Sequence, residues 1–519
     1  VIRRRIKSMV YEAELYNPRE TCIRQRQFTT ASGRSLDICI TTRGSVKVRY
    51  GHVKRTSDIT EVFNTLDDVL DTSDRTPELY RAVKEFIEGI STQLASLDGF
   101  MINKESNVVE MRYDSEVVGD RLVMFIPFYG EYTIENEKRA GLLALRLIVR
   151  PDGSVEEYRV HEGGEPIQFQ LGDKIVYKDY LQHFASAEPL REFLPRPSLV
   201  LNVLDGIKNN VNPSFSEAIK QVGEYLDKYV YMTGIDRLLV VLWTVAQAFF
   251  DLLRYFPLLV VYGEYGSGKR QLAIAVTSAW IISMRVSGRS TEASLMRIMD
   301  QLHPSVAIDE GEKLLEQMPE FWNSAYERDL VITRSRIDPS SGKLLVDAFS
   351  VYGPKVFLIK PALISPRIDL SSRTIEVRIS RVRNRIFPLE IDEADRLRIN
   401  TLLVLLKIRH WHEYIEAYEL LRRVMVGVDQ RTRDTFLPVL TVAYLAARES
   451  GDVSLFRQVL LEFASIASRR SGLERTQEVT VAGLLRIILT SPSLEGDYRR
   501  YVEVTARDVL ENAKAIMNL

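Results

Sequence analysis

The chain has 519 residues, which is too long for one hydrophobic core and predicts about three domains. Hydrophobic residues make up 45% and charged residues 27%, the composition of an ordinary soluble globular protein. Lys and Arg number 69 against 70 Asp and Glu, so the net charge does not indicate a nucleic-acid binder. A ring with a basic channel and an acidic exterior has the same balance, so the charge does not exclude one.

The cysteine and apolar content argues against zinc sites and membrane spans. Cys22 and Cys39 lack zinc-ligand spacing and fit a reducing interior, so we expect a cytoplasmic protein. The most apolar stretch, 238–253, is too short and too polar for a bilayer and predicts a buried helix. The chain begins at Val1 without the apolar run of a signal peptide, and we expect its natural start to lie upstream. High Arg, Glu, Ile and Val are typical of a thermophile.

Residues 1–200 predict a mixed α+β domain. A hairpin is expected around residues 42–45, and a helix over 78–97. The expected strands are 108–113, 121–128, 142–149 and 154–160, with a tight turn at 150–153. These strands hold no paired carboxylates of the primase or polymerase kind.

The rest of the chain predicts a nucleotide-binding core followed by helices. Residues 194–198 read as a linker, and helices are expected over 215–255. We place the core at 201–390 and a helical lid at 391–519, where apolar residues recur at helical spacing in 397–406 and 436–447. Segments 479–489 and 501–519 resemble the start of a winged-helix module.

A strand, a glycine-rich loop and a helix follow one another at 258–284, as the P-loop motif requires. The loop lets backbone N–H groups converge on phosphate oxygens at the positive end of the helix. Lys269 supplies a mobile cation for the β and γ phosphates. The expected nucleotide-binding residues are Gly263, Glu264, Tyr265, Gly266, Ser267, Gly268, Lys269, Arg270 and Gln271.

Arg270 breaks the motif, because Ser or Thr normally follows the lysine and its hydroxyl binds Mg²⁺. A guanidinium has donors and no acceptor, so it cannot be a metal ligand. Either Mg²⁺ is held by phosphates, water and the acidic strand alone, or the site binds nucleotide and hydrolyses it slowly. An inward-pointing Arg270 would reduce the dependence of nucleotide binding on Mg²⁺, whereas an outward-pointing one would leave room for the metal.

An apolar strand at 305–308 ends in adjacent carboxylates, Asp309 and Glu310. At this spacing after Lys269, the pair predicts the second half of the nucleotide site. Asp309 would hold Mg²⁺ through water, and Glu310 would orient and deprotonate the attacking water. The pair indicates the class of P-loop ATPases that has an extra strand between the two motifs, which includes AAA+ proteins and superfamily 3 helicases.

Residues 229–381 resemble the helicase-type ATPase domain of plasmid and phage primase-helicase proteins. The matching pieces are the helix with Trp243, Phe256 and Pro257 before the strand, and the segments 308–312, 323–326, 352–355, 370–375 and 433–440. The resemblance implies an α/β core with a parallel sheet flanked by helices, and a ring, typically a hexamer, that binds ATP and Mg²⁺ between subunits. It also implies action on DNA in replication or in a mobile element such as an archaeal or thermophile plasmid or virus.

Three further residues acquire expected roles from this fold. Lys360, at the end of the next core strand, would contact the γ-phosphate. Arg373 would reach the nucleotide of the neighbouring subunit and stabilise charge in the transition state. Arg433 resembles a lid-helix arginine that closes over nucleotide. For each of the three, a solvated surface residue is the alternative.

Residues 330–349 predict a hairpin inserted between the acidic strand and the next core strand. In related helicases a hairpin at this place grips DNA in the ring channel. Arg334, Arg336 and Lys343 would then contact phosphates. The alternative is an extension of the sheet with solvated charges.

Two functions from different classes remain open. The first is an ATP-dependent, ring-forming DNA helicase or translocase, with residues 1–200 as a collar, a DNA-entry platform or a docking site for replication partners. The second is an ATP-binding assembly switch with weak hydrolysis that recruits partners on DNA, and Arg270 is its main support. A motor acting on protein is disfavoured, because the aromatic-glycine pore loop of unfoldases is missing.

Overall fold

The computed structural model describes residues 22–471 with short gaps. The undescribed residues inside that range are 42–44, 52, 59–61, 96–107, 135–136, 185, 187, 288–290, 312–314, 316–317, 338–343, 360–371, 383–386 and 426–428. The chain forms two compact units, Val1–Ser106 and Asn107–Leu519. Each unit has hydrophobic core clusters of its own.

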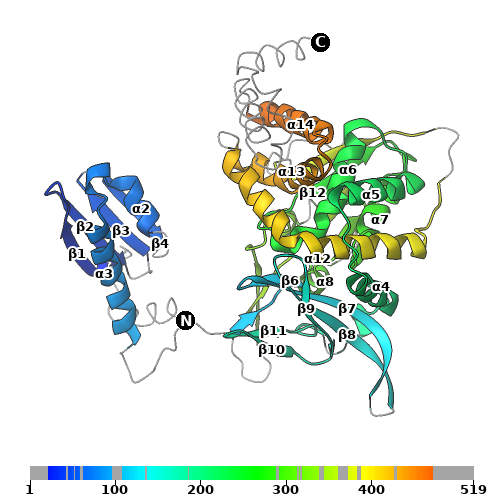
Figure 1. The fold of residues 1–519 in the computed structure, drawn as a ribbon, viewed down its shortest axis with the longest axis horizontal. Helices are drawn as coiled ribbons and strands as arrows, with labels where there is room; N and C mark the ends of the chain where they lie inside the picture. Colours follow the sequence, from blue (N-terminus) through cyan, green and yellow to red (C-terminus); the bar gives the residue numbers. More distant parts are fainter. Residues whose placement is uncertain are drawn as a thin grey trace, which may run out of the picture. The chain divides into compact units, whose positions relative to one another are not determined.

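The first unit is an antiparallel sheet covered by helices (Figure 1). Its strands pair in chain order: β1 (Cys22–Thr29), β2 (Ser35–Thr41), β3 (Ser45–Tyr50) and β4 (Val53–Asp58). Two α-helices, α2 (Val62–Val69) and α3 (Pro77–Ala95), pack on the sheet, with a short 3₁₀ turn, η2 (Thr72–Asp74), between them. The predicted hairpin around 42–45 and the predicted helix over 78–97 are confirmed.

Cys39 is buried in β2 and is disulfide-bonded, and the chain has one other cysteine, Cys22. Disulfides are rare in reducing compartments except in hyperthermophiles, whose intracellular proteins contain many. The bond is therefore compatible with the thermophile composition, and the cytoplasmic location stays a prediction.

The second unit opens with two small sheets, which contain the four predicted strands and others that were not predicted. An antiparallel sheet contains β6 (Ser115–Val118), β7 (Arg121–Ile134), β8 (Glu137–Val149) and β9 (Val155–Glu162) in that order. A three-stranded sheet contains β10 (Ile167–Leu171), β11 (Lys174–Lys178) and β5 (Val108–Glu110). The predicted turn after β8 is present, since the Gly153 N–H bonds to the Arg150 carbonyl at 3.0 Å.

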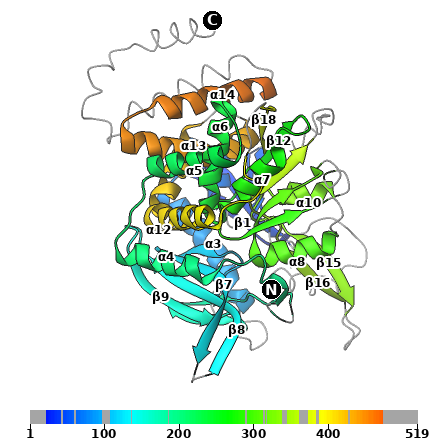
Figure 2. The same cartoon turned by 90° about the vertical axis from the view of Figure 1, so that its right-hand side faces the viewer.

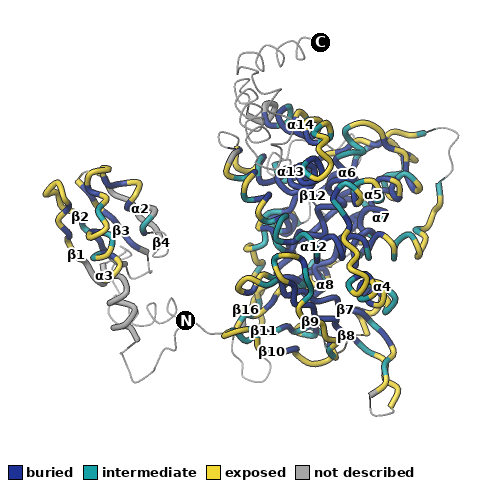
Figure 3. The backbone as a smooth tube through the Cα atoms, viewed as in Figure 1, coloured by how far each residue is buried: buried dark blue, intermediate teal, exposed yellow. Residues whose placement is uncertain are grey.

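The helices that follow fill the predicted stretch 215–255, and one further helix, α4 (Pro197–Lys208), begins inside the segment predicted as a linker. After a 3₁₀ turn, η3 (Glu188–Leu190), the helices are α4, α5 (Phe215–Tyr229), α6 (Gly234–Ala246) and a 3₁₀ segment, η4 (Gln247–Leu252). From Leu239 to Ala246 every residue of α6 is buried, so the apolar stretch is an internal helix as expected. Figure 3 shows α5, α6 and α7 among the buried parts of this unit.

A five-stranded sheet, all parallel, forms the centre of the second unit. Its strands are β12 (Leu258–Gly263), β13 (Ser283–Val286), β14 (Ser305–Ile308), β17 (Lys355–Ile359) and β18 (Thr374–Ile379), and the spatial order is β13-β14-β17-β12-β18. Connecting helices are α7 (Lys269–Ser278), α8 (Glu292–Leu302) and α10 (Pro319–Ser324). Since β17 lies between β12 and β14, the extra strand predicted between the two motifs is confirmed.

Three helices close the described part of the chain: α12 (Glu393–Val424), α13 (Gln430–Ser450) and α14 (Ser454–Ser471). Asp392 and Asp429 accept backbone N–H bonds at the starts of α12 and α13, as N-cap residues do. The predicted helical region after residue 391 is therefore confirmed as far as residue 471. The winged-helix prediction for 479–489 and 501–519 falls outside the described residues.

One hydrophobic cluster runs across the sequence boundaries that we expected at 200 and 390. Phe125 of the first sheet, Trp243 of α6 and Leu405 of α12 belong to the same buried cluster. Residues 107–200 thus pack with the nucleotide-binding core. The division into 1–200, 201–390 and 391–519 stays a prediction about how the chain is organised.

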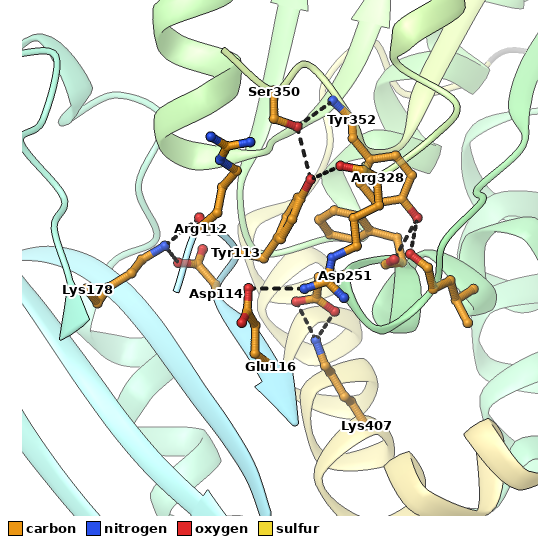
Figure 4. Close-up of polar contacts among 12 residues, drawn as sticks. Arg112, Tyr113, Asp114, Glu116, Lys178, Asp251, Arg328, Ser350, Tyr352 and Lys407 are labelled. Atoms are coloured by element: carbon orange, nitrogen blue, oxygen red, sulfur yellow. Dashed lines mark hydrogen bonds and ion pairs between the residues drawn. The ribbon is translucent and has the colours of Figure 1, made fainter. Parts of the chain in front are cut away.

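A network of buried polar contacts joins the two small sheets of the second unit to the nucleotide-binding core (Figure 4). The Lys178 ammonium lies 3.2 Å from an Asp114 carboxylate oxygen. The Arg328 guanidinium lies 3.1 Å from Glu116, and the Tyr113 hydroxyl donates to the Arg328 carbonyl at 3.0 Å. The contacts of Arg328 join segments more than two hundred residues apart in the sequence.

Lys407 of α12 and Asp251 of η4 form the most buried ion pair of this network (Figure 4). The Lys407 ammonium donates to both Asp251 oxygens, at 2.6 and 2.8 Å, and the two side chains are 0% and 3% exposed. Burial lowers the pKa of Lys407, and the carboxylate opposes that shift. Loss of either partner would leave the other as an uncompensated buried charge, which is strongly destabilising.

We expect Lys407→Ala to lower the free energy of unfolding by about 3–5 kcal/mol, because Asp251 would stay buried without a counter-charge. The double variant Asp251→Leu with Lys407→Met should recover most of that loss, since no charge is left buried. Urea unfolding followed by circular dichroism measures both. Arg422→Ala is the matched control, because Arg422 pairs with Glu419 on the same helix at 39% and 40% exposure, and a loss below about 1 kcal/mol is expected there.

Lys355 is a second buried charge, at the start of β17. It is fully buried, and its ammonium nitrogen has no hydrogen-bond partner in the part of the chain that the structure describes. Burial lowers the pKa of Lys355 from 10.5 to about 7. The folded state therefore favours the neutral amine, and protonation at lower pH works against folding.

Between pH 7 and 10.5 the unfolded chain binds the Lys355 proton more tightly than the folded chain, so this group makes stability rise with pH over that window. We expect Lys355→Met to raise the free energy of unfolding most near pH 7 and to flatten its rise toward pH 9. Urea unfolding at several pH values checks this, with the exposed Lys220→Met on α5 as control. A steeper pH dependence in Lys355→Met than in the wild type would contradict the assignment.

Candidate nucleotide site

The loop between β12 and α7 has the backbone of a phosphate-binding loop. Gly266 and Gly268 have φ of 76° and 92°, values that residues with a Cβ rarely adopt. Gly268 is the N-cap residue of α7, so the helix N-terminus faces the loop. The predicted order of strand, glycine loop and helix is confirmed.

Lys269 holds the loop in shape. Its ammonium donates to the Gly263 carbonyl at 2.5 Å and to the Glu264 carbonyl at 2.7 Å. These bonds keep the Lys269 ammonium beside the loop. A bound phosphate would replace the two carbonyl oxygens as its hydrogen-bond acceptor. Tyr265, at the loop tip, is 98% exposed.

Two buried polar atoms of this segment have no hydrogen-bond partner within the described residues: Ser267 Oγ and Gln271 Nε2. Buried polar groups are nearly always bonded, so unpaired donors beside a glycine loop indicate a polar ligand. The loop, Lys269 and these two side chains together fit the phosphates of a nucleotide.

The acidic strand ends at the same edge of the sheet. Asp309 follows β14, and its backbone N–H bonds to the Val286 carbonyl at 2.9 Å. Glu310 has φ of 54°, an uncommon value for a residue with a Cβ, and its N–H donates to an Asp309 carboxylate oxygen at 3.1 Å. An unusual backbone of this kind is frequent at functional sites. Since parallel strands end at one edge, Asp309 and Glu310 lie on the same side of the sheet as the loop.

Arg270 points toward the acidic strand. Its Nε lies 3.6 Å from Asp309 Oδ2, and the two side chains are 66% and 45% exposed. The fold generally serves ATP together with Mg²⁺, which needs oxygen ligands in an octahedron. Here Arg270 stands where a Ser or Thr hydroxyl is expected. Its guanidinium lies against Asp309, which is the other expected metal ligand. The residues present therefore do not fit the Mg²⁺ site that we expected from the motif.

Arg373 lies at the opposite edge of the sheet. Its carbonyl accepts from the N–H of Leu258, the first residue of β12, whereas the loop follows the last residue, Gly263. Six residues of strand separate the edges by about 17 Å. The guanidinium donates to Asn323 Oδ1 at 3.1 Å. Arg373 therefore cannot reach the nucleotide of its own chain.

Arg433 lies at that same opposite edge. Thr435, two residues further along α13, donates to the carbonyl of Ser372 at 2.8 Å. Arg433 is 18% exposed, and its Nε donates to Asp434 Oδ1 at 3.1 Å. The structure thus does not bring Arg433 to the loop of its own chain. If Arg433 closes over a nucleotide, that nucleotide is bound by another subunit.

The predicted hairpin is present as β15 (Ile332–Ile337) and β16 (Leu344–Phe349), which extend away from the central sheet (Figure 2). Arg334 forms an ion pair with Glu292 of α8. Arg336 pairs with Asp347 on the neighbouring strand at 2.7 Å. Both arginines are thus already neutralised, while Lys343 and Lys360 fall outside the described residues. The DNA contacts and the γ-phosphate contact stay predictions.

Sequence reasoning missed several features of the site. It left open whether Arg270 points into the site or outward, and it did not predict the contact with Asp309. It did not predict that α13, which carries Arg433, begins at the other edge of the sheet. None of the helices that the structure describes is long and apolar enough to cross a membrane. No cluster of three or more His, Cys, Asp or Glu side chains able to hold a metal occurs in the described ranges.

The sheet order, the loop and the acidic strand give the second unit the fold of P-loop proteins of the extra-strand class. No family model matches the sequence, and no curated protein matches it. Among solved structures, the chain is similar to a full-length MCM homolog from Methanopyrus kandleri, with a TM-score of 0.31 and 12% identity. That similarity covers 70% of this chain and 78% of the homolog. A likeness this distant does not transfer residue roles.

Proposed function

We propose that this protein is a ring-forming, ATP-driven DNA helicase or translocase. The observation that supports this best is the position of Arg373. In one chain the loop and the acidic strand share one edge of the sheet, and Arg373 lies at the other. A site completed by that arginine requires a neighbouring subunit, and repetition of one such head-to-tail contact builds a closed ring.

Each residue of the site has a role in this proposal. Lys269 binds the β and γ phosphates, and the backbone of the glycine loop surrounds them. Glu310 takes the proton of the attacking water. Arg373 of the next subunit neutralises charge that develops on the γ-phosphate, and Arg433 faces the same interface. Lys360 would contact the γ-phosphate from the end of β17.

DNA is the proposed partner because the core resembles that of plasmid and phage primase-helicases and because a hairpin projects from it. The ring is proposed to be a hexamer. The hairpin would meet DNA through Arg334, Arg336 and Lys343, and the first two must exchange their carboxylate partners for phosphates to do so. The first unit would serve as a collar or as a docking site for replication proteins.

We expect DNA to stimulate ATP hydrolysis by the full chain, and Glu310→Gln to lower the stimulated rate by about 10²–10⁴-fold, because the general base is lost. Phosphate release with and without single-stranded and double-stranded DNA measures this. Glu224→Gln, an exposed carboxylate on α5, is the control and should hydrolyse at the wild-type rate. Wild-type hydrolysis by Glu310→Gln would remove Glu310 from the mechanism.

A second candidate is the same ring used as an ATP-binding switch with little turnover. The ion pair between Arg270 and Asp309 favours it, since the expected metal ligands are engaged with each other. In this case ATP would change the assembly state while hydrolysis stays near zero with or without DNA. Sedimentation with and without ATP, run beside the phosphate-release assay, separates the two candidates.

The position of Arg373 predicts complementation between subunits. Arg373→Ala alone should abolish assembly-dependent hydrolysis but leave ATP affinity nearly intact, and Lys269→Ala should lose affinity. Mixing the two variants should restore part of the activity, because some interfaces then pair an intact loop with an intact arginine. Arg159→Ala, an exposed arginine on β9, is the control and should be active alone. Mixed rings confirmed by native mass spectrometry that show no recovery at any ratio would rule out the role across subunits.

A further inference from the structure

The residue after the P-loop lysine is the unusual feature of this site. Arg270 begins the helix with Lys269, and its guanidinium is turned across the site toward Asp309 rather than outward along α7, with Nε 3.6 Å from Oδ2. The two groups come from α7 and from the end of β14, which are the elements expected to supply the metal's protein ligands. One positively charged side chain thus lies between them.

A guanidinium at this place and a magnesium ion exclude each other. Arginine offers five N–H donors and no lone pair, so it cannot join the oxygen octahedron of Mg²⁺. With the guanidinium beside Asp309, a divalent ion bound to that carboxylate would also lie within a few ångströms of a positive charge, which repels it. The guanidinium is, on the other hand, the side chain best suited to a phosphate, which it binds with two parallel hydrogen bonds.

We propose that Arg270 takes the place of the metal and that the protein binds its nucleotide as the metal-free triphosphate. Asp309 then positions the guanidinium instead of holding Mg²⁺. Because both side chains are about half exposed or more, their ion pair is weak, and the guanidinium can turn to a phosphate at little cost. The proposal rests on the nucleotide site of the proposed function, and it applies to the motor and to the switch alike.

Calorimetric titration of the full chain with ATP, in excess EDTA and in excess MgCl₂, tests the proposal. We expect the wild type to bind ATP in EDTA about as tightly as with Mg²⁺. Arg270→Thr restores the usual hydroxyl, and should lose about 10- to 100-fold of its affinity in EDTA, the range of one charge-assisted hydrogen bond, and regain it with Mg²⁺. Arg297→Thr is the control and should behave as the wild type does, because the Arg297 guanidinium bonds to the Ala293 carbonyl of its own helix.

Asp309→Asn gives a second test that does not depend on the folding of Arg270→Thr. Loss of the carboxylate releases Arg270, so ATP binding should be unchanged or tighter in EDTA and also in MgCl₂, whereas at a metal site the same change weakens binding in MgCl₂. Wild-type binding that requires Mg²⁺ would overturn the proposal and leave the nucleotide site standing. Absence of ATP binding under both conditions, with the fold intact by circular dichroism, would instead remove the proposed function itself.

Discussion

The common direction of the five central strands fixes where every chemical group of the site lies. Because β12 and β14 run parallel, Lys269 and Asp309 follow strands that end at one edge of the sheet. Because β18 runs the same way beside β12, Arg373 precedes it at the other edge. A single chain therefore contains two halves of the proposed site that face away from each other. Assembly is then a geometric requirement of the proposed function.

The buried charges restrict which parts of the second unit can move. Separating Lys407 from Asp251 would leave two uncompensated charges in a dry environment, which costs several kcal/mol. The hydrophobic cluster that includes Phe125 and Leu405 runs through the same region. The described part of the second unit is therefore expected to move as one body. A nucleotide-driven rearrangement would then occur mainly between subunits, where the groups at the two edges meet.

The sequence predicted those parts of the structure that local pattern determines. The glycine loop, the apolar strand before Asp309 and the projecting hairpin were all placed correctly, because glycine spacing, continuous apolar runs and a central turn act over a few residues. The four-residue strand β13 and the pair β10 and β11 were not predicted, since short strands have too little periodicity to recognise. Burial of Lys355 was missed as well, because only the packing of distant segments removes it from water.

The contact of Arg270 with Asp309 connects the metal question to the assembly question. Mg²⁺ brings two positive charges to the phosphates, whereas a guanidinium brings one. On the proposed arrangement the missing charge can come from Arg373 of the neighbouring subunit, which is held at the interface edge by Asn323. Charge that develops in the transition state would then be fully neutralised only in the assembled ring. A lone subunit would bind the nucleotide without hydrolysing it. With arginine in place of the usual hydroxyl, hydrolysis would therefore depend on a neighbouring subunit more strictly than it does at a metal-containing site.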